Sequence, residues 1–149
     1  MEIEKVITNN EEETIEFGRN FAARLKPGDA VALYGALGAG KTEFIKGVCR
    51  HYKVEEIVSS PTFTILNQYI GYANDDKIPI YHIDLFRIKS LKELDEIGFE
   101  ECIYTEDAVK LIEWAEKAEG KLPQIHYNVK ILSSDSDENE RTISVERLI

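Results

Sequence analysis

The segment GALGAGKT, residues 35–42, constrains the fold more than any other part of the sequence. It matches the spacing G-x-x-x-x-G-K-[S/T], in which glycines let the backbone turn tightly and point its N–H groups at a phosphate chain. An apolar run at residues 30–34 precedes the segment, and apolar residues recur at helical spacing within residues 44–49. Strand, loop and helix in this order predict a phosphate-binding loop at the N-terminal end of a helix.

Two side chains of this loop have predictable chemistry. Lys41 places a positive charge near the terminal phosphates of a bound nucleotide, and the hydroxyl of Thr42 is suited to bind Mg²⁺. The helix that begins at Lys41 adds the positive end of its dipole. The loop therefore predicts a site for a nucleotide together with its magnesium ion.

The composition limits the kinds of partner that fit. At 149 residues with 43% hydrophobic content, the chain is expected to form one domain, residues 1–149. A net charge of −10 argues against direct binding of nucleic acid. We find no apolar run long enough to span a membrane and no signal-peptide pattern, so we expect a cytoplasmic protein.

The sequence also contains one cluster of basic residues and two cysteines. The cluster Lys46, Arg50, His51 and Lys53 is interpreted either as a solvated helix face or as a docking patch for an acidic partner or RNA. The cysteines, Cys49 and Cys102, show no metal-ligand spacing with the histidines, and Cys49 is expected to be a buried free thiol.

The hydrophobic pattern predicts an α/β fold. It resembles the three-layer arrangement of P-loop NTPases, with helices on both faces of a largely parallel core sheet and an added C-terminal antiparallel hairpin. Helices are expected after Asn9 or Asn10, ending at Pro27-Gly28-Asp29, then from Lys41, and after a cap at Ser90. The expected strands are residues 3–8, 30–34, 63–69, 78–86 and 108–114, followed by 125–131 and 143–145 as the hairpin.

Carboxylates end two of the predicted strands. Asp84 follows the strand IPIYHID, and Glu113 follows the apolar residues Leu111 and Ile112. Because ligands bind at the carboxyl ends of parallel strands, both are candidates to hold Mg²⁺ or to orient water beside the loop. The alternatives are a turn-capping role for Asp84 and a surface position for Glu113. His82 is interpreted as an ordinary strand residue.

Five motifs in series give the chain a family resemblance. They are GALGAGKT, SSPTFTILNQY, YHIDLFR, LKELDEIGFEE and LIEWAEKAEGKLP, which together cover most of residues 35–123. In this order they resemble the TsaE family, small bacterial ATPases needed to form threonylcarbamoyladenosine in tRNA. The sequence departs from many relatives at Ala36, where an acidic residue is common.

The resemblance implies roles for individual residues. Lys41, Asp84 and Glu113 are implied to be catalytic, and Thr42, Asp84 and Glu113 to hold Mg²⁺. Ser60, Pro61 and Thr62 resemble a switch-like segment near the γ-phosphate. The full set expected to contact nucleotide is Gly35, Gly38, Ala39, Gly40, Lys41, Thr42, Glu43, Thr62 and Arg141, with Thr8 and Glu11 from the N-terminal region.

The resemblance also implies a function. ATP and Mg²⁺ are the expected cofactors, and the TsaD–TsaB complex is the expected partner, with tRNA contacted only through that complex and no membrane involved. GTP is disfavoured because the guanine-reading motif N-K-x-D is absent from the sequence. Two other functions remain open at this stage. One is a P-loop kinase for a small molecule, and the other is a protein-binding module gated by nucleotide without turnover.

Overall fold

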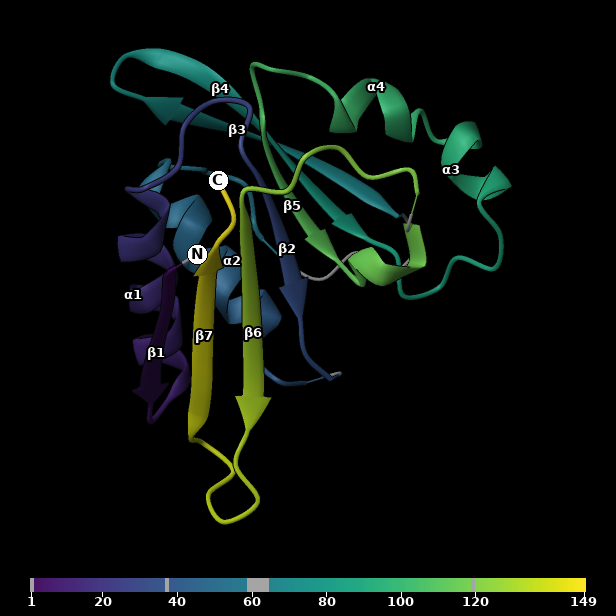
Figure 1. Ribbon diagram of the computed structural model, residues 1–149. Helices are drawn as coiled ribbons and strands as arrows, with labels where there is room; N and C mark the ends of the chain where they lie inside the picture. The colour runs from purple at the N-terminus through teal and green to yellow at the C-terminus, as the bar shows by residue number, and fades with distance from the viewer. Residues whose placement is uncertain (1, 37, 59–64, 119) are drawn as a thin grey trace.

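A computed structural model describes residues 2–36, 38–58, 65–118 and 120–149 of the chain (Figure 1). Within these residues one seven-stranded sheet has the strand order β1-β7-β6-β2-β5-β4-β3. Its strands are β1 (Glu2–Thr8), β2 (Ala30–Tyr34), β3 (Leu66–Ala73), β4 (Asp76–Asp84), β5 (Val109–Glu113), β6 (Tyr127–Ser133) and β7 (Arg141–Arg147). The helices are α1 (Glu11–Ala22), α2 (Lys41–His51), α3 (Lys92–Glu96), α4 (Phe99–Ile103) and the 3₁₀ helix η1 (Ala115–Ala118).

The predicted architecture is confirmed. The central strands β6, β2, β5 and β4 are parallel to one another, and β7 returns antiparallel to β6 as the C-terminal hairpin. Strand β1 pairs with β7 at one edge of the sheet, and β3 forms a hairpin with β4 at the other edge. Helices α1 and α2 cover one face, whereas α3 and α4 lie on the opposite face (Figure 1).

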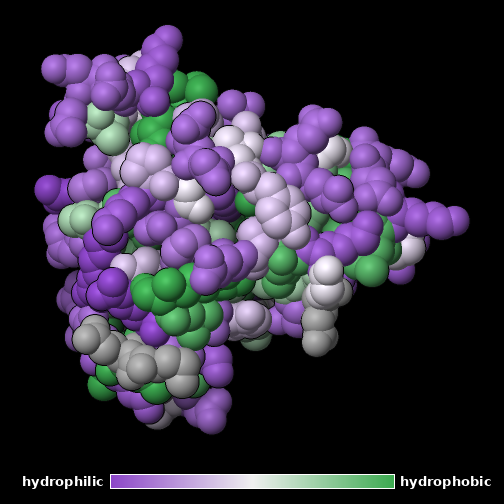
Figure 2. All heavy atoms as spheres, turned by 45° about the horizontal axis from the view of Figure 1, so that its top comes forward, coloured by the Kyte–Doolittle hydropathy of each residue, from purple (hydrophilic) through white to green (hydrophobic). Residues whose placement is uncertain are grey.

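The alternation of side chains explains these layers. In β2, Val31 and Leu33 point into the core beneath α1 and α2, while Ala32 points into the second core beneath α3 and α4. Strands β2 and β5 are buried on both faces, and β2 accordingly reads as a continuous apolar run. Hydrophilic residues cover most of the face shown in Figure 2. Among the described residues no helix is long and apolar enough to cross a membrane.

Strand register brings the functional segments to the carboxyl ends of the parallel strands. In the parallel pairs, Leu33 lies opposite Glu113, and Glu113 lies opposite Asp84. Strand β2 continues to Tyr34 and then enters the glycine-rich loop. The loop and the two predicted carboxylates therefore start from the same level of the sheet, at the carboxyl ends of neighbouring strands.

Local sequence explains the start of α1. The side chain of Asn10 caps this helix, since its Oδ1 accepts a hydrogen bond from the Glu13 amide at 2.8 Å. Three glutamates, residues 11–13, then occupy the first turn, where the helix dipole favours negative charge. The predicted choice between Asn9 and Asn10 is thereby resolved in favour of Asn10.

Two helix boundaries differ from the prediction. Helix α1 ends at Ala22, before Pro27, because the chain tightens into turns in which Arg24 N–H donates to Phe21 and Leu25 N–H to Ala22. Ser90 does not cap α3, whose N-cap position is Leu91. The carboxylate of Glu93 instead accepts from the amide of Ser90 at 3.2 Å. A further short helix, α4, follows Gly98, where no separate helix was predicted from the sequence.

The contact between α1 and α2 supplies a test of the packing. A Cβ atom added at Gly47 would lie 1.9 Å from the carbonyl oxygen of Ile15. In an open helix, Gly→Ala is stabilising by about 1 kcal/mol, but overpacking costs about 1–3 kcal/mol. Because the clash is with backbone, we expect overpacking to outweigh helix propensity and Gly47→Ala to lower the free energy of unfolding by up to about 2 kcal/mol in urea denaturation.

The control for this change is Lys46→Ala, one residue away on the same helix. Lys46 is only half-buried, so its removal should alter the free energy of unfolding by less than about 0.5 kcal/mol. A Gly47→Ala protein more stable than wild type would show that helix propensity outweighs the close approach of α1.

Candidate functional site

The glycine-rich loop ends in a backbone conformation that favours glycine. Gly40, the N-cap residue of α2, has φ 113°, a value that residues with a Cβ rarely adopt. The first amides of a helix have no partner within the helix, so those at the start of α2 are available to an anion. Gly40 and the start of α2 thus have a geometry that suits an anion.

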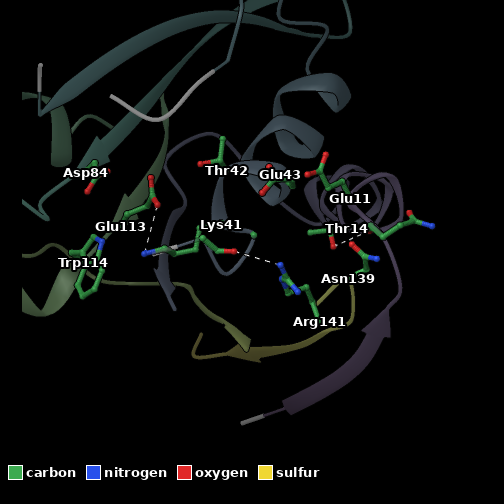
Figure 3. Close-up of a pocket in the computed structure, with 13 residues that line it drawn as sticks. Glu11, Thr14, Lys41, Thr42, Glu43, Asp84, Glu113, Trp114, Asn139 and Arg141 are labelled. Atoms are coloured by element: carbon green, nitrogen blue, oxygen red, sulfur yellow. Dashed lines mark hydrogen bonds and ion pairs between the residues drawn. The ribbon is translucent and has the colours of Figure 1, made fainter. Parts of the chain in front are cut away.

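A cavity of about 450 Å³ opens at this end of the sheet (Figure 3). Residues of the loop and of α2 form its floor, strands β4 and β5 supply one wall, and α1 with the β6–β7 hairpin supplies the other. The lining residues are Asn10, Glu11, Thr14, Gly38, Gly40, Lys41, Thr42, Glu43, Asp84, Glu113, Trp114, Asn139 and Arg141.

Glu113 lies almost fully buried at the inner end of the cavity, with 3% of its surface exposed. Its Oε2 lies 2.7 Å from His82 Nε2, and its Oε1 lies 3.8 Å from Lys41 Nζ. The predicted alternative of a surface glutamate is therefore wrong for this position. A buried carboxylate needs compensating donors and positive charge, and these two side chains supply them.

Lys41 extends across the loop toward Glu113 and Trp114 (Figure 3). Its ammonium lies 4.3 Å from the centre of the Trp114 ring, a cation–π geometry. The group is 5% exposed, and its Nζ has no hydrogen-bond acceptor among the described residues. A buried ammonium with three unused N–H donors fits the oxygens of a phosphate chain entering the cavity.

Asp84 occupies the end of β4 beside Glu113. Burial raises the pKa of its carboxyl, and the negative charge of Glu113 adds to that increase. The amide of Phe86, which donates to Asp84 Oδ1 at 3.0 Å, acts in the opposite direction, as does the positive charge of Lys41. Two carboxylates and the Thr42 hydroxyl around one cavity are the oxygen donors that Mg²⁺ prefers, so the residues fit this ion.

The outer half of the cavity joins the hairpin to the loop. Arg141 donates to the carbonyls of Glu138 and Glu140 at 2.6 and 2.9 Å, and it reaches the carbonyl of Gly38 at 3.5 Å. These bonds hold the hairpin turn against the glycine-rich loop (Figure 3). Asn139 of the same turn faces the cavity opposite α1.

The structure does not place every predicted residue at the cavity. Gly35 and Ala39 are absent from its lining, and Ala39 is buried in the core beneath the loop. Thr8 is buried behind Thr14 and does not line the cavity; its hydroxyl forms a hydrogen bond with the Thr14 hydroxyl at 2.7 Å. Ser60, Pro61 and Thr62 lie outside the described residues. The other predicted contacts, including Glu11, Glu43 and Arg141, line the cavity.

Sequence patterns missed several residues of the site. Asn10 was expected only as a helix cap, and no site role was predicted for Thr14 or Asn139. His82 was expected to be an ordinary strand residue, yet it bonds Glu113. The alternation of β4 was the available signal, because His82 shares a face with Ile78 and Ile80, which lie toward α2.

Comparisons with known proteins agree with this arrangement. The family model described as "Threonylcarbamoyl adenosine biosynthesis protein TsaE" matches residues 8–143. Proteins named tRNA threonylcarbamoyladenosine biosynthesis protein TsaE are similar in Bacillus subtilis (40% identity over 92% of this chain and 82% of the relative) and Treponema pallidum (35% over 95% and 98%). The crystal structure of YdiB from Bacillus subtilis superimposes with a TM-score of 0.76 at 35% identity, covering 99% of this chain and 87% of that one. With the matched model spanning the loop, both carboxylates and the hairpin arginine, the chain belongs to the TsaE family.

Proposed function

We propose that this chain is a Mg²⁺-dependent ATPase that binds the TsaD–TsaB complex and supports formation of threonylcarbamoyladenosine in tRNA. The observation that carries the ATPase assignment is the buried Lys41 ammonium, which has no acceptor among the described residues and lies at the glycine-rich loop beside Glu113. Family membership supports the role in tRNA modification, since the relatives are named for that pathway.

The residues suggest a division of roles during hydrolysis. Amides at the start of α2 and the Lys41 ammonium bind phosphate oxygens and stabilise the charge that develops as the terminal phosphoryl group is transferred to water. Thr42 and Asp84 are the residues that would hold Mg²⁺, which supplies further neutralisation of phosphate charge. Catalysis then depends mainly on positioning and electrostatics.

Glu113 is the better placed carboxylate for orienting the attacking water. Its side chain is 4% exposed and contacted on both oxygens, whereas Asp84 is only half-buried. A group that orients water must itself be held in one geometry, because misplacement of the nucleophile raises the barrier. Asp84, which faces the cavity from the end of β4, is then left to bind the metal.

The proposed partner fits the charge of the chain. With a net charge of −10, the chain is poorly suited to bind tRNA by itself, and contact through a protein complex avoids that repulsion. The basic cluster at the end of α2 is partly neutralised, because Arg50 pairs with Glu12 at 2.8 Å. This pairing favours the interpretation of that cluster as a solvated helix face.

The first test is ATP hydrolysis with Mg²⁺, measured for the chain alone and with purified TsaD and TsaB. We expect slow turnover alone and faster turnover with the pair. Phosphorylation of a small molecule in place of phosphate release would identify a kinase instead. Hydrolysis that the pair leaves unchanged would contradict the proposed partner, and absence of nucleotide binding would contradict the ATPase assignment.

Lys41→Met tests the site assignment with least disturbance of packing. Methionine keeps most of the apolar stem of Lys41 but removes the charge that lies over the Trp114 ring. We expect turnover to fall at least about 100-fold, since the lost group stabilises transition-state charge. Urea denaturation controls for folding, because Glu113 loses one of its two partners in this variant. Wild-type turnover in folded Lys41→Met protein would exclude Lys41 from the mechanism.

The raised pKa of Asp84 gives a test of pH dependence. Because burial shifts this pKa upward, the folded chain without ligand binds a proton at Asp84 more tightly than the unfolded chain does. That contribution to stability is complete below the unfolded value of 3.8 and is lost as the pH rises through the folded pKa. At neutral pH the ionised carboxylate therefore destabilises the ligand-free fold.

We expect Asp84→Asn to raise the free energy of unfolding at pH 7 in the absence of ligand while removing Mg²⁺-dependent hydrolysis. Asparagine keeps an acceptor for the Phe86 amide, so the change mainly removes charge. The stability difference should shrink as the pH is lowered toward the range where the wild-type carboxyl is protonated. Equal stability of the two proteins at every pH would contradict the raised pKa.

A further inference from the structure

His82 lies near the end of β4, beside the cavity, and has no role in the proposed mechanism. Its side chain is fully buried, with 0% exposed, and its Nε2 lies 2.7 Å from Glu113 Oε2. The two residues come from adjacent parallel strands, where Asp84 lies opposite Glu113 and His82 lies opposite Leu111. His82 and Glu113 are therefore diagonal neighbours on the face that α2 covers.

This contact divides the oxygens of Glu113 between two environments. Oε2 is occupied by His82, whereas Oε1 points toward Lys41 at 3.8 Å. The second ring nitrogen, His82 Nδ1, has no hydrogen-bond partner among the described residues. The tautomer with the proton on Nε2 fits this arrangement, since its N–H donates to the carboxylate and leaves no buried donor on Nδ1 without an acceptor.

The contact between His82 and Glu113 would matter most when bound phosphate draws Lys41 away from Glu113. Lys41 lacks an acceptor in the ligand-free site, and phosphate oxygens would draw its ammonium away from Glu113. A carboxylate that is 4% exposed would then lose its nearby positive charge. His82 would be its remaining hydrogen-bond donor among the contacts of the described residues.

We propose that His82 is a positioning residue, whose Nε2–H holds Oε2 of Glu113 and so directs Oε1 into the cavity whether or not Lys41 is engaged by phosphate. The inference rests on the proposed function, because it takes Glu113 as the group that orients water. It predicts that His82 affects turnover through Glu113 and leaves nucleotide binding largely intact. A merely structural role would change stability without that separation.

The first test needs no nucleotide. Long-range ¹H–¹⁵N NMR of the ligand-free chain reports the tautomer of each of its three histidines. We expect His82 to show a slowly exchanging, downfield-shifted Nε2–H, and Glu113→Gln to move that proton upfield. A proton on Nδ1 in the wild-type chain, or an Nε2–H signal unchanged by Glu113→Gln, would overturn the proposal.

Three variants then separate positioning from packing. His82→Leu removes the donor, and His82→Gln keeps an N–H near the position of Nε2. Ile80→Val trims an apolar neighbour on the same face of β4, which contacts the core away from Glu113. The fluorescence of Trp114, the chain's one tryptophan, measures ATP affinity beside the site, and phosphate release measures turnover.

For His82→Leu we expect kcat to fall about 10- to 100-fold, the range typical when a partner of a functional group is removed. ATP affinity should stay within about threefold of wild type, because the lost interaction acts mainly in the transition state. His82→Gln should recover much of the loss, and Ile80→Val should keep wild-type kcat despite a lower free energy of unfolding.

Two results would overturn the positioning role. One is wild-type kcat in folded His82→Leu protein. The other is a folded His82→Gln protein that loses as much turnover as His82→Leu. A wild-type chain that hydrolyses no ATP would overturn the proposed function instead, and the imidazole signal would still confirm or refute the His82–Glu113 bond. The two failures are therefore distinguishable.

Discussion

The buried charge of Glu113 is the constraint on which the rest of the site depends. All five residues of β5 are buried, so the carboxylate at the end of this strand is buried as well. Burial of an ion is unfavourable without donors and opposite charge close by. Those come from His82 on β4 and Lys41 at the start of α2. Two neighbouring elements must therefore adopt one arrangement relative to β5 if the buried carboxylate is to keep both contacts.

The pairing of parallel strands provides that arrangement. Because opposite residues of parallel strands point to the same face, the pairing of Asp84 with Glu113 places both carboxylates toward α2. The pairing of Leu33 with Glu113 brings the glycine-rich loop to the same level. A shift of one residue in either pair would turn a charged group into the opposite core, where apolar residues pack under α3 and α4.

The sequence predicts those parts of the fold whose signals are local. Buried strands, the helix after the loop and the C-terminal hairpin follow from apolar runs and alternation, and the structure confirms them. The end of α1 was predicted wrongly because it is set by tighter turns beyond Ala22 and by contacts such as the Gly28 amide with the Ala108 carbonyl. A single-sequence pattern carries no record of a bond between segments so far apart.

The same difference between local signals and contacts across the sequence applies to the site. Lys41 was predicted from the spacing of the glycine-rich loop, and Asp84 and Glu113 from their positions at the ends of apolar strands, signals that are local in the sequence. Asn139 reaches the cavity only because β7 lies between β1 and β6, an order that no local pattern specifies. The role of His82 depends on its register with a strand that begins more than twenty residues later, at Val109.

The residue after Glu113 places an aromatic ring beside the Lys41 ammonium. Trp114 has φ 60°, a left-handed conformation that costs a bulky residue about 1–3 kcal/mol. This turn stops β5 directly after the carboxylate and brings the indole ring under the Lys41 ammonium. The same ring packs against Phe86, whose amide holds Asp84. One strained turn thus links the lysine and both carboxylates, which is a physical reason for a glutamate–tryptophan pair at the end of this strand.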